Sequence, residues 1–382
     1  MTWPRIPLGE LSVERGGSVD PSKYPNEIFE LFSIPAFDKG EAEIIAGKEI
    51  GSSKKCVQPN DVLISRIVPH IRRSWVVPEI NGYRQIASGE WIQFRSDQIY
   101  PNFLRHFLVS DPFYQKFMKT VSGVGGSLLR ARPKEVYRIK VPLPPLEEQK
   151  RIARILDTAD EIRAKRRQSI EELDRLAQSV FLDMFGDPVK NPKGWPRINL
   201  AKIASINGKL VNPTKAEYQN LLHFGPDRIS KDTGVLLDAK TAREDQLISS
   251  KFLCYPGEIL YSKIRPYLNK VALVQEKCLC SADVYPIKPL PKYLTIEFLW
   301  VLLRSNDFLN YVASFSRRAN IPKINRKQLF GYSAPVPPLE NQKKYSSIIQ
   351  SIESQKSLLQ QHLTELDNLF ASLQSRAFNG SL

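Results

Sequence analysis

The chain has 382 residues, of which 42% are hydrophobic and 25% are charged. This length exceeds one ordinary core and allows two or three domains, and the composition excludes wholesale disorder. The formal net charge of +15 favours a polyanionic partner such as nucleic acid, although a basic protein that is merely well solvated would also carry it.

The N-terminal stretch MTWPRIPLGELSVERGG lacks the apolar segment of a secretory signal peptide. No apolar run approaches the roughly 18 residues of a membrane span. The four cysteines, Cys56, Cys254, Cys278 and Cys280, make a poor disulfide framework and fit a reducing compartment. We therefore expect a cytoplasmic protein with no membrane contact. Cys278 and Cys280 are interpreted as strand residues, and a zinc site is the lesser alternative because no second ligand pair lies near.

The first region, residues 1–145, is predicted to be a mixed α+β domain. Alternating apolar residues over 61–67 and the β-branched and aromatic run 90–95 predict strands, and residues 100–109 predict a short helix. Basic side chains follow the first of these strands and precede the proline-rich end of the region: Arg66, Arg72 and Arg73, then Arg130, Arg132, Lys134 and Arg138.

A long helix is predicted next, over residues 146–187, because Pro144 and Pro145 supply a start signal. Apolar residues then recur at alternating spacings of three and four, which is a heptad seam. Its members are Ile152, Ile155, Ala159, Ile162, Arg166, Ser169, Leu173, Leu176 and Val180.

The remainder of the chain repeats this plan, with a second domain over 188–338 and a second helix over 339–382. PLPPLEEQK at 142–150 returns as PVPPLENQK at 335–343, 193 residues later, and other anchors recur at offsets between 192 and 197. The strand at 61–67 has its counterpart within 256–264, and 295–303 predicts a short helix. The chain is therefore one module written twice.

The second helix has a matching seam, displaced by 193 residues from the first: Tyr345, Ile348, Ile352, Gln355, Leu359, His362, Leu366, Leu369 and Leu373. We expect the two helices to pack on one another in an antiparallel coiled coil with pseudo-two-fold symmetry, which would place the domains at its opposite ends. Without stagger, Arg166 faces Leu359, and Ser169 faces Gln355 in a hydrogen-bonding layer that fixes register. A coiled coil between two chains is the alternative.

Basic residues occupy corresponding places in the second domain: Lys263, Arg265 and Lys270, then Arg317, Arg318, Lys323, Arg326 and Lys327. Lysine and arginine neutralise phosphates, and arginine also makes bidentate bonds to guanine. Each residue alone could be a solvated surface charge, but placement at the same two points of both copies predicts DNA contact for the sets.

Catalytic motifs are not found. Adenine methylation needs a DPPY-like or NPPF-like tetrapeptide, and Asn191-Pro192-Lys193-Gly194 lacks its second proline and its aromatic ring. None of the four histidines has another histidine or a cysteine at the sequence spacing that a metal-ligand pair needs. We expect no catalytic residue, no cofactor and no metal site on this chain.

Three segments, PLPPLEEQKRIARIL, FLDMFGDPVKNPKGWP (181–196) and PGEILYSKIRPYLNK (256–270), resemble the specificity subunit of type I restriction-modification enzymes. The resemblance covers the whole chain, in the order target-recognition domain, helix, target-recognition domain, helix. It implies a DNA-reading subunit without catalysis, in which each domain reads half of a bipartite asymmetric double-stranded target. The helices would set the spacer and dock two methyltransferase subunits, and restriction subunits would join. S-adenosylmethionine, ATP and Mg²⁺ would bind those partners.

Two other functions stay open at this point. The chain could be a stand-alone DNA methyltransferase or nuclease whose motifs are not recognised, or a coiled-coil scaffold without DNA function. The basic net charge argues against the scaffold.

Overall fold

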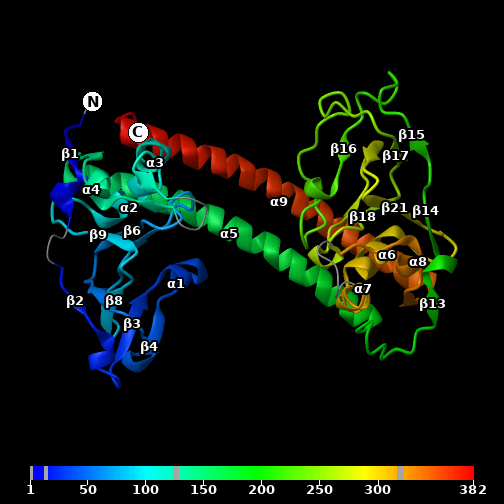
Figure 1. Ribbon diagram of the computed structural model, residues 1–382, viewed down its shortest axis with the longest axis horizontal. Helices are drawn as coiled ribbons and strands as arrows, with labels where there is room; N and C mark the ends of the chain where they lie inside the picture. Colours follow the sequence, from blue (N-terminus) through cyan, green and yellow to red (C-terminus); the bar gives the residue numbers. More distant parts are fainter. Residues whose placement is uncertain (1–2, 13–15, 124–128, 316–321) are drawn as a thin grey trace. The chain divides into compact units, whose positions relative to one another are not determined.

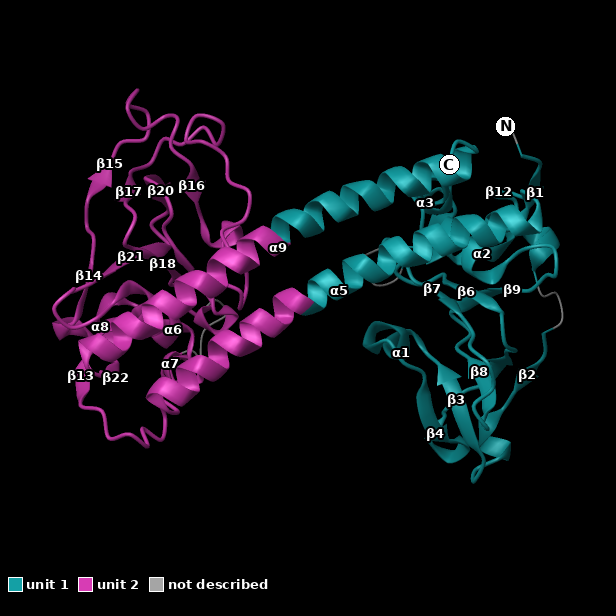
Figure 2. Cartoon of the chain, turned by 180° about the vertical axis from the view of Figure 1, so that it is seen from behind, with its two compact units in different colours: residues 1–168, 360–382 teal, residues 169–359 magenta. Residues whose placement is uncertain are grey.

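The computed structural model describes residues 3–12, 16–123, 129–315 and 322–382 (Figure 1). The chain forms two compact units, residues 1–168 with 360–382 and residues 169–359 (Figure 2). The limits of the units fall inside the two long helices, so each helix contributes one part to each unit.

In unit 1, short strands alternate with short helices ahead of a long helix. The elements in chain order are β1 (Arg5–Pro7), β2 (Ser18–Val19), β3 (Ile28–Phe32), α1 (Ile34–Lys39), β4 (Glu43–Ala46), β5 (Lys54–Cys56), β6 (Val62–Ser65), β7 (Ser74–Val76), β8 (Arg84–Ala87), β9 (Trp91–Phe94), α2 (Pro101–Leu108), α3 (Asp111–Met118), β10 (Val121–Ser122), β11 (Arg130–Ala131), α4 (Pro133–Val136), β12 (Lys140–Pro142) and α5 (Leu146–Phe185).

Three layers make up the core of unit 1. The five-stranded sheet β2-β5-β8-β3-β4 packs on the three-stranded sheet β7-β6-β9 through Phe32, Leu63 and Trp91. The other face of the smaller sheet packs on α2, α3 and the start of α5. The end of α9 (Leu339–Asn379) joins this core, where the Phe378 ring lies 5.5 Å from that of Phe103.

Unit 2 repeats this plan with differences in the outer sheet. Its elements are the second part of α5, β13 (Arg197–Asn199), β14 (Ala204–Ile206), β15 (Leu210–Val211), β16 (His223–Phe224), β17 (Lys251–Cys254), β18 (Ile259–Ser262), β19 (Val271–Leu273), β20 (Cys278–Cys280), β21 (Val284–Pro289), α6 (Ile296–Arg304), α7 (Asn306–Ala313), α8 (Arg326–Phe330), β22 (Ser333–Pro335) and the first part of α9.

Two four-stranded sheets, β14-β21-β18-β19 and β15-β17-β20-β16, face one another in unit 2. The first sheet also packs on α6, α7, α9 and the end of α5, which supplies Phe181 and Phe185. Cys278 and Cys280 are buried in β20, as expected for strand residues. In each domain the first strand pairs with the last, Arg5 opposite Pro142 and Arg197 opposite Pro335, so that the chain leaves at the start of a long helix.

The α+β fold and the two long helices predicted from the sequence are confirmed. Strands β6 and β9 lie within 61–67 and 90–95, α2 lies within the predicted helix at 100–109, and α6 is shifted by one residue from the predicted helix at 295–303. The domain limits at 145, 187 and 338 stay a prediction, because the two contact units divide within the helices.

The helices α5 and α9 pack antiparallel, and the same pattern is seen within each unit. In unit 1, Arg163 donates to Asp367 at 2.6 Å. In unit 2, Lys356 donates to Asp174 at 2.6 Å, and the Tyr345 ring lies 5.7 Å from Phe181. Lys356 follows Arg163 by 193 residues and Asp367 follows Asp174 by 193, so the two ion pairs are pseudo-symmetric equivalents.

Part of the predicted seam is wrong by one residue. The positions that are exposed are Ile162, Leu176, Ile348, Gln355 and Leu369. The buried or half-buried positions are the residues that follow each of them: Arg163, Ala177, Ile349, Lys356 and Phe370. Gln355 was expected to face Ser169, and Lys356 takes the buried position instead. The other predicted members are buried or half-buried: Ile152, Ile155, Arg166, Ser169, Leu173, Ile352, Leu359, His362 and Leu366.

Within the described ranges, no helix is long and apolar enough to cross a membrane.

Candidate nucleic-acid interface

Two loops of the first domain that are far apart in the sequence meet on one carboxylate. Arg66 follows strand β6, and its Nε lies 3.0 Å from Oε2 of Glu90, the residue before β9. Arg130, in β11, reaches the same carboxylate at 3.3 Å. The backbone amide of Ala131 donates to the Arg66 carbonyl at 2.8 Å and fixes the approach of the two loops. We call Arg66, Glu90 and Arg130 the first cluster.

The second domain builds the same arrangement from different residues. Lys263 and Lys323 lie 3.4 Å and 3.7 Å from Oδ1 of Asp283. The Ile324 amide donates to the Lys263 carbonyl at 2.9 Å, as Ala131 does to Arg66 in the first domain. We call Lys263, Asp283 and Lys323 the second cluster. Both clusters place two cations on one anion, so each has a surplus positive charge.

The carboxylate of the first cluster stays ionised. Burial alone would raise the pKa of Glu90, but hydrogen bonds from Arg130 and Arg66 lower it below its ordinary value. The outer cation of each cluster remains accessible, since the side chain of Arg130 is 40% exposed and that of Lys323 is 53% exposed. Either cation can therefore reach an external anion without leaving its loop.

The loop beside each cluster contains a strained backbone. Val68 has a φ of 47° and Arg265 has a φ of 48°, and these residues occupy equivalent positions. A β-branched residue in the left-handed region costs on the order of 1–3 kcal/mol, so the surrounding structure must impose it. Here the Val68 amide donates to the Leu129 carbonyl at 3.1 Å, and the backbone amide of Arg265 donates to the Pro322 carbonyl at 2.7 Å. Each strained residue thereby holds the first basic loop against the second.

Two of the predicted contact residues in the first domain serve the fold. Arg73 is buried and makes a bidentate ion pair with Asp38 at 2.7 and 2.8 Å. Arg72 stacks over the Tyr114 ring at 4.1 Å and lies 2.6 Å from Asp111. Packing and ion pairing already account for both side chains.

The other predicted residues take no part in the two clusters. Arg132 donates to the Thr120 carbonyl at 3.3 Å, Arg138 pairs with Glu135 at 3.2 Å, and Lys270 donates to the Pro226 carbonyl at 2.6 Å. The exposed members for which the described part of the chain supplies no ion-pair partner are Arg132, Lys134, Arg265, Arg326 and Lys327. Arg317 and Arg318 lie outside the described residues.

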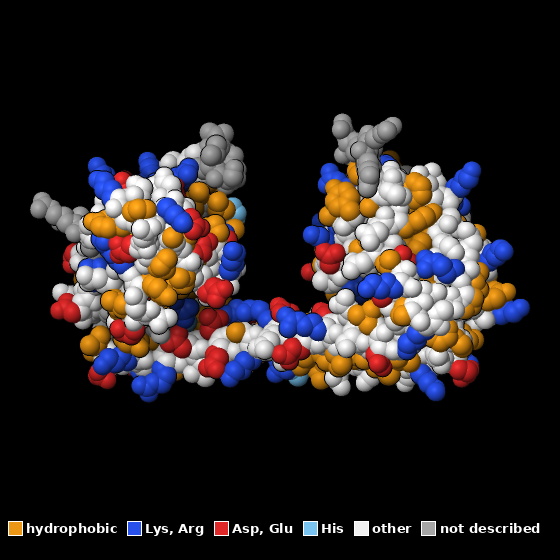
Figure 3. Space-filling view, turned by 90° about the horizontal axis from the view of Figure 1, so that it is seen from below, with side chains coloured by type: hydrophobic (Ala, Val, Ile, Leu, Met, Phe, Trp, Pro, Cys, Tyr) orange, Lys and Arg blue, Asp and Glu red, His pale blue; other side chains and the backbone are white. Residues whose placement is uncertain are grey.

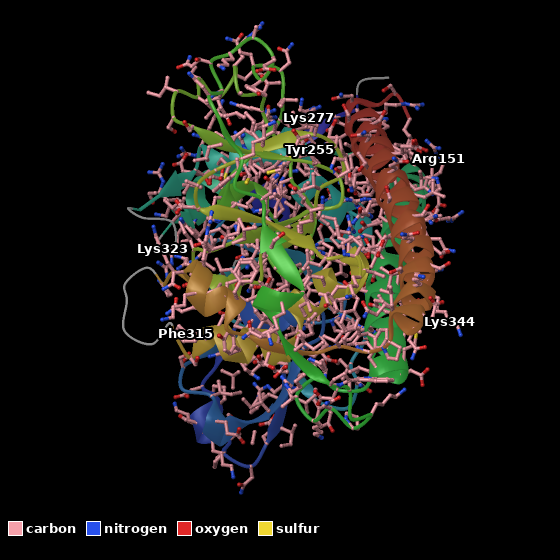
Figure 4. All side chains as sticks on the ribbon, turned by 90° about the vertical axis from the view of Figure 1, so that its right-hand side faces the viewer. Arg151, Tyr255, Lys277, Phe315, Lys323 and Lys344 are labelled. Atoms are coloured by element: carbon pink, nitrogen blue, oxygen red, sulfur yellow. The ribbon has the colours of Figure 1, made fainter. Side chains whose placement is uncertain are left out.

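The second cluster faces away from the long helix of its own unit. In Figure 4, Lys323 and Phe315 lie on one side of unit 2, whereas Lys344 lies on α9 at the other. Figure 3 shows basic and acidic side chains interspersed on the face of each unit that it presents.

Sequence reasoning missed the carboxylates of the clusters. The repeat alignment contained a signal for them, since SGEW at 88–91 corresponds to SADV at 281–284 and places Glu90 opposite Asp283. An acidic residue kept at the same place in both copies, beside basic loops, indicates an ion-pair partner.

It also missed the glutamine of the repeated PPLExQK segment. Gln149 is buried, accepts from the Tyr100 amide at 2.7 Å and donates to the carbonyls of Gln98 and Pro144. Gln342 accepts from the Thr295 amide at 3.0 Å and donates to the Tyr293 and Pro337 carbonyls. The repeated segment is thus a joint that hydrogen-bonds each domain to its helix.

The family model of the type I restriction modification DNA specificity domain matches residues 5–174 and again 192–368. The chain belongs to this family. The EcoDI specificity subunit of Escherichia coli is 29% identical over 301 residues, a match that covers 69% of this chain and 67% of that protein. Two other curated specificity subunits, MjaVIII of Methanocaldococcus jannaschii and StySPI of Salmonella potsdam, are 23% identical and are covered over 56% and 66% of their own length.

Solved structures of the same class share the fold. The S subunit of a type I restriction-modification system from M. genitalium has a TM-score of 0.61 at 13% identity, with 99% of this chain and 96% of that chain covered. A chain from a structure on assembly and conformational transition of the type I system has a TM-score of 0.54 at 22% identity, with 100% and 98% covered. The family match and the curated relative make the chain a DNA specificity subunit of a restriction-modification system, and its specificity domain is present twice.

The specificity-subunit family is distinct from the catalytic subunits. Across the described residues, no group of three or more His, Cys, Asp or Glu side chains is arranged to hold a metal ion.

Proposed function

We propose that this specificity subunit reads a bipartite asymmetric target in double-stranded DNA, with one half-site for each domain. The observation that carries the proposal is the recurrence of one cation-on-carboxylate arrangement at equivalent positions of two domains that otherwise differ in sequence. A shared geometry with different side chains suits two readers of different half-sites.

The proposed contact set is centred on the two clusters and their neighbouring loops. Arg66 and Arg130 serve the first half-site, and Lys263 and Lys323 serve the second. Other basic residues of the same segments complete the set: the exposed Arg132, Lys134, Arg138, Arg265, Arg326 and Lys327, and the half-buried Lys270. Arg72 and Arg73 are left out because they pack within the domain. Arginine in this set can read guanine, and lysine supplies phosphate contacts.

The long helices are proposed to set the spacer between the half-sites and to dock two methyltransferase subunits. Helix α5 has 40 residues, which at ~1.5 Å per residue gives about 60 Å, longer than one turn of B-DNA at about 34 Å. Base pairs between the half-sites would then go unread. The methyltransferase and restriction subunits would supply catalysis and bind S-adenosylmethionine, ATP and Mg²⁺ in the cytoplasm.

Reconstitution tests this function. The chain alone, methyltransferase subunits alone and the mixture are incubated with duplex DNA and labelled S-adenosylmethionine, and methyl transfer is measured at several salt concentrations. We expect transfer to a defined motif only in the mixture, with DNA binding that weakens as salt rises. Transfer by the chain alone would identify an enzyme. Methylation by the mixture without sequence preference would contradict the proposed role of the chain in DNA sequence recognition.

A further inference from the structure

The turn at residues 67–71, between β6 and β7, has the same backbone frame as the turn at residues 264–268, between β18 and β19. Each contains one left-handed residue, Val68 in the first turn and Arg265 in the second, and a buried proline follows it directly. The amide three residues after the left-handed residue donates back to its carbonyl, at 3.0 Å in the first turn and 2.9 Å in the second. The two turns are therefore closed in the same way.

Side chains at the ends of the turns also make equivalent bonds. In each domain two side chains donate to backbone carbonyls: Ser65 to Ile67 and Ser262 to Ile264, both at 3.0 Å, then Arg72 to Val109 at 3.1 Å and Asn269 to Arg304 at 3.4 Å. Arg72 and Asn269 differ in size and charge, yet each bonds the carbonyl at the end of the helix that follows its sheet. The frame of the turn is thus kept although the residues that build it have changed.

The side chain at the tip of each turn is an exposed ring, and the ring differs between the domains. His70 and Tyr267 occupy the same place, two residues after the left-handed residue, and Tyr267 is 52% exposed. Neither side chain makes a hydrogen bond, an ion pair or a ring contact with any other residue that the structure describes. A rigid frame that presents a different free side chain in each domain is typical of loops that carry specificity.

Each ring also lies close to the outer cation of its cluster. Isolated β-bridges pair Ile67 with Arg130 and Ile264 with Lys323, and the tip of the turn comes three residues after the bridge in both domains. Three residues of chain span at most about 11 Å, and successive nucleotides of a DNA strand are about 3.4 Å apart along the axis. Contacts made by the ring and by the cation therefore fall within a few base pairs, inside one half-site.

The chemistry of the two rings suits base edges. The Tyr267 hydroxyl can donate and accept a hydrogen bond, and its ring can contact a thymine methyl group. The His70 ring nitrogens can donate to, or accept from, a base edge in the major groove. A tyrosine neutralises no phosphate, so its contribution to binding depends on the base it meets and not on the charge of the backbone.

We propose that His70 and Tyr267 are specificity-determining residues that contact base edges, His70 in the half-site of the first domain and Tyr267 in that of the second. The proposal rests on the proposed function, because it takes the two half-sites as given. It adds to each basic contact set one ring whose identity differs between the domains.

Binding selection from a duplex library of random sequence tests the proposal, with the full-length chain and its methyltransferase subunits. The wild-type selection defines the motif. His70→Ala and Tyr267→Ala are selected separately, as are the exchanges His70→Tyr and Tyr267→His. Tyr255→Ala is the matched control, because Tyr255 is also an exposed tyrosine of unit 2 but lies away from Lys323 (Figure 4). Thermal melting checks that each variant is folded.

We expect Tyr267→Ala to lower discrimination by about tenfold at one or two base pairs of one half-site, and His70→Ala to do so in the other half-site only. The exchanges should change the base that is preferred at those positions. Tyr267→Ala should leave the slope of log affinity against log salt unchanged, because it removes no charge. Tyr255→Ala should select the wild-type motif.

The wild-type motif at full stringency from both alanine variants would overturn the proposal. An equal loss of affinity for every duplex would also overturn it, as would a change in both half-sites after one substitution or a motif change in Tyr255→Ala as large as in Tyr267→Ala. If the wild-type complex itself selected no bipartite motif, the proposed function would be contradicted instead.

Discussion

Replacing Arg130 and Lys323 by alanine, one at a time, tests whether the two clusters contact different halves of the target. The two residues occupy equivalent places, are the outer cations of their clusters and are 40% and 53% exposed. Each change removes one charge and leaves the inner cation on its carboxylate. Neither residue is buried, so we expect the fold to tolerate both changes.

The expected loss of DNA affinity depends on the ion pair that each cation already makes before it binds DNA. A specific contact to a base edge contributes about 1–3 kcal/mol, but Arg130 already shares Glu90 at 3.3 Å and Lys323 shares Asp283 at 3.7 Å. We therefore expect each variant to lose binding free energy in the lower half of that range. A loss of ~1.4 kcal/mol corresponds to about tenfold in affinity. Loss of one phosphate contact would also reduce the slope of log affinity against log salt by about 0.9.

The assay measures binding of the reconstituted complex to three duplexes: the full target, and the target with either half-site scrambled. Arg130→Ala should lower discrimination at one half only, and Lys323→Ala at the other. Lys344→Ala, on exposed α9 surface away from the second cluster, is the control and should leave affinity within about twofold. The reasoning is refuted if both cluster variants lose the same half-site, or if Lys344→Ala loses as much as they do.

Three further predictions concern the stability of the fold, and urea or thermal unfolding checks each. Asp174→Asn should cost about 2 kcal/mol and Lys356→Met only about 1 kcal/mol, because the ammonium is 4% exposed and would keep only the more distant carboxylate of Glu353 at 3.4 Å. Gln149→Leu should cost about 2–3 kcal/mol, because it strands a buried amide and carbonyl that the glutamine pairs. Burial lowers the pKa of His106 despite its contact with Asp157, so stability should be full above about pH 6.5 and fall as the pH drops toward the folded pKa.

Each of these has an outcome that contradicts it. If Asp174→Asn and Lys356→Met lowered the free energy of unfolding equally, burial of the unpaired ammonium would not be the main cost. A Gln149→Leu variant as stable as the wild type would mean that water or a shifted backbone replaces the joint. If His106→Asn left the slope of stability between pH 6.5 and pH 5 unchanged, another group would be responsible for it.

The long helices were predictable because proline start signals and a repeated apolar spacing act locally. The seam was misplaced by one residue at five positions, and at two of them the residue that turns inward is charged. Lys356 is buried and Arg163 is half-buried, since each reaches an aspartate on the other helix. Spacing alone cannot distinguish Ile155 from Leu156 as the core residue, and here Leu156 is the more deeply buried of the two.

The clusters were only half predictable. The basic segments of both copies could be found in the sequence. The contact of Arg66 and Arg130 with one carboxylate could not, because it depends on a β-bridge between segments that are far apart in the chain. Arg73 was predicted to contact DNA, but in the structure its guanidinium pairs with the carboxylate of Asp38 in α1. Tertiary pairing of this kind leaves no local pattern.

The central claim is that each domain reads its own half of one split target. Single-molecule sequencing of adenine methylation tests it most directly, in a host carrying the wild-type chain and in one where residues 1–145 are exchanged for those of a relative. We predict a bipartite methylated motif with a fixed unread spacer, in which the exchange alters one half and leaves the other half and the spacer unchanged. A continuous motif, or a change in both halves, would contradict the account.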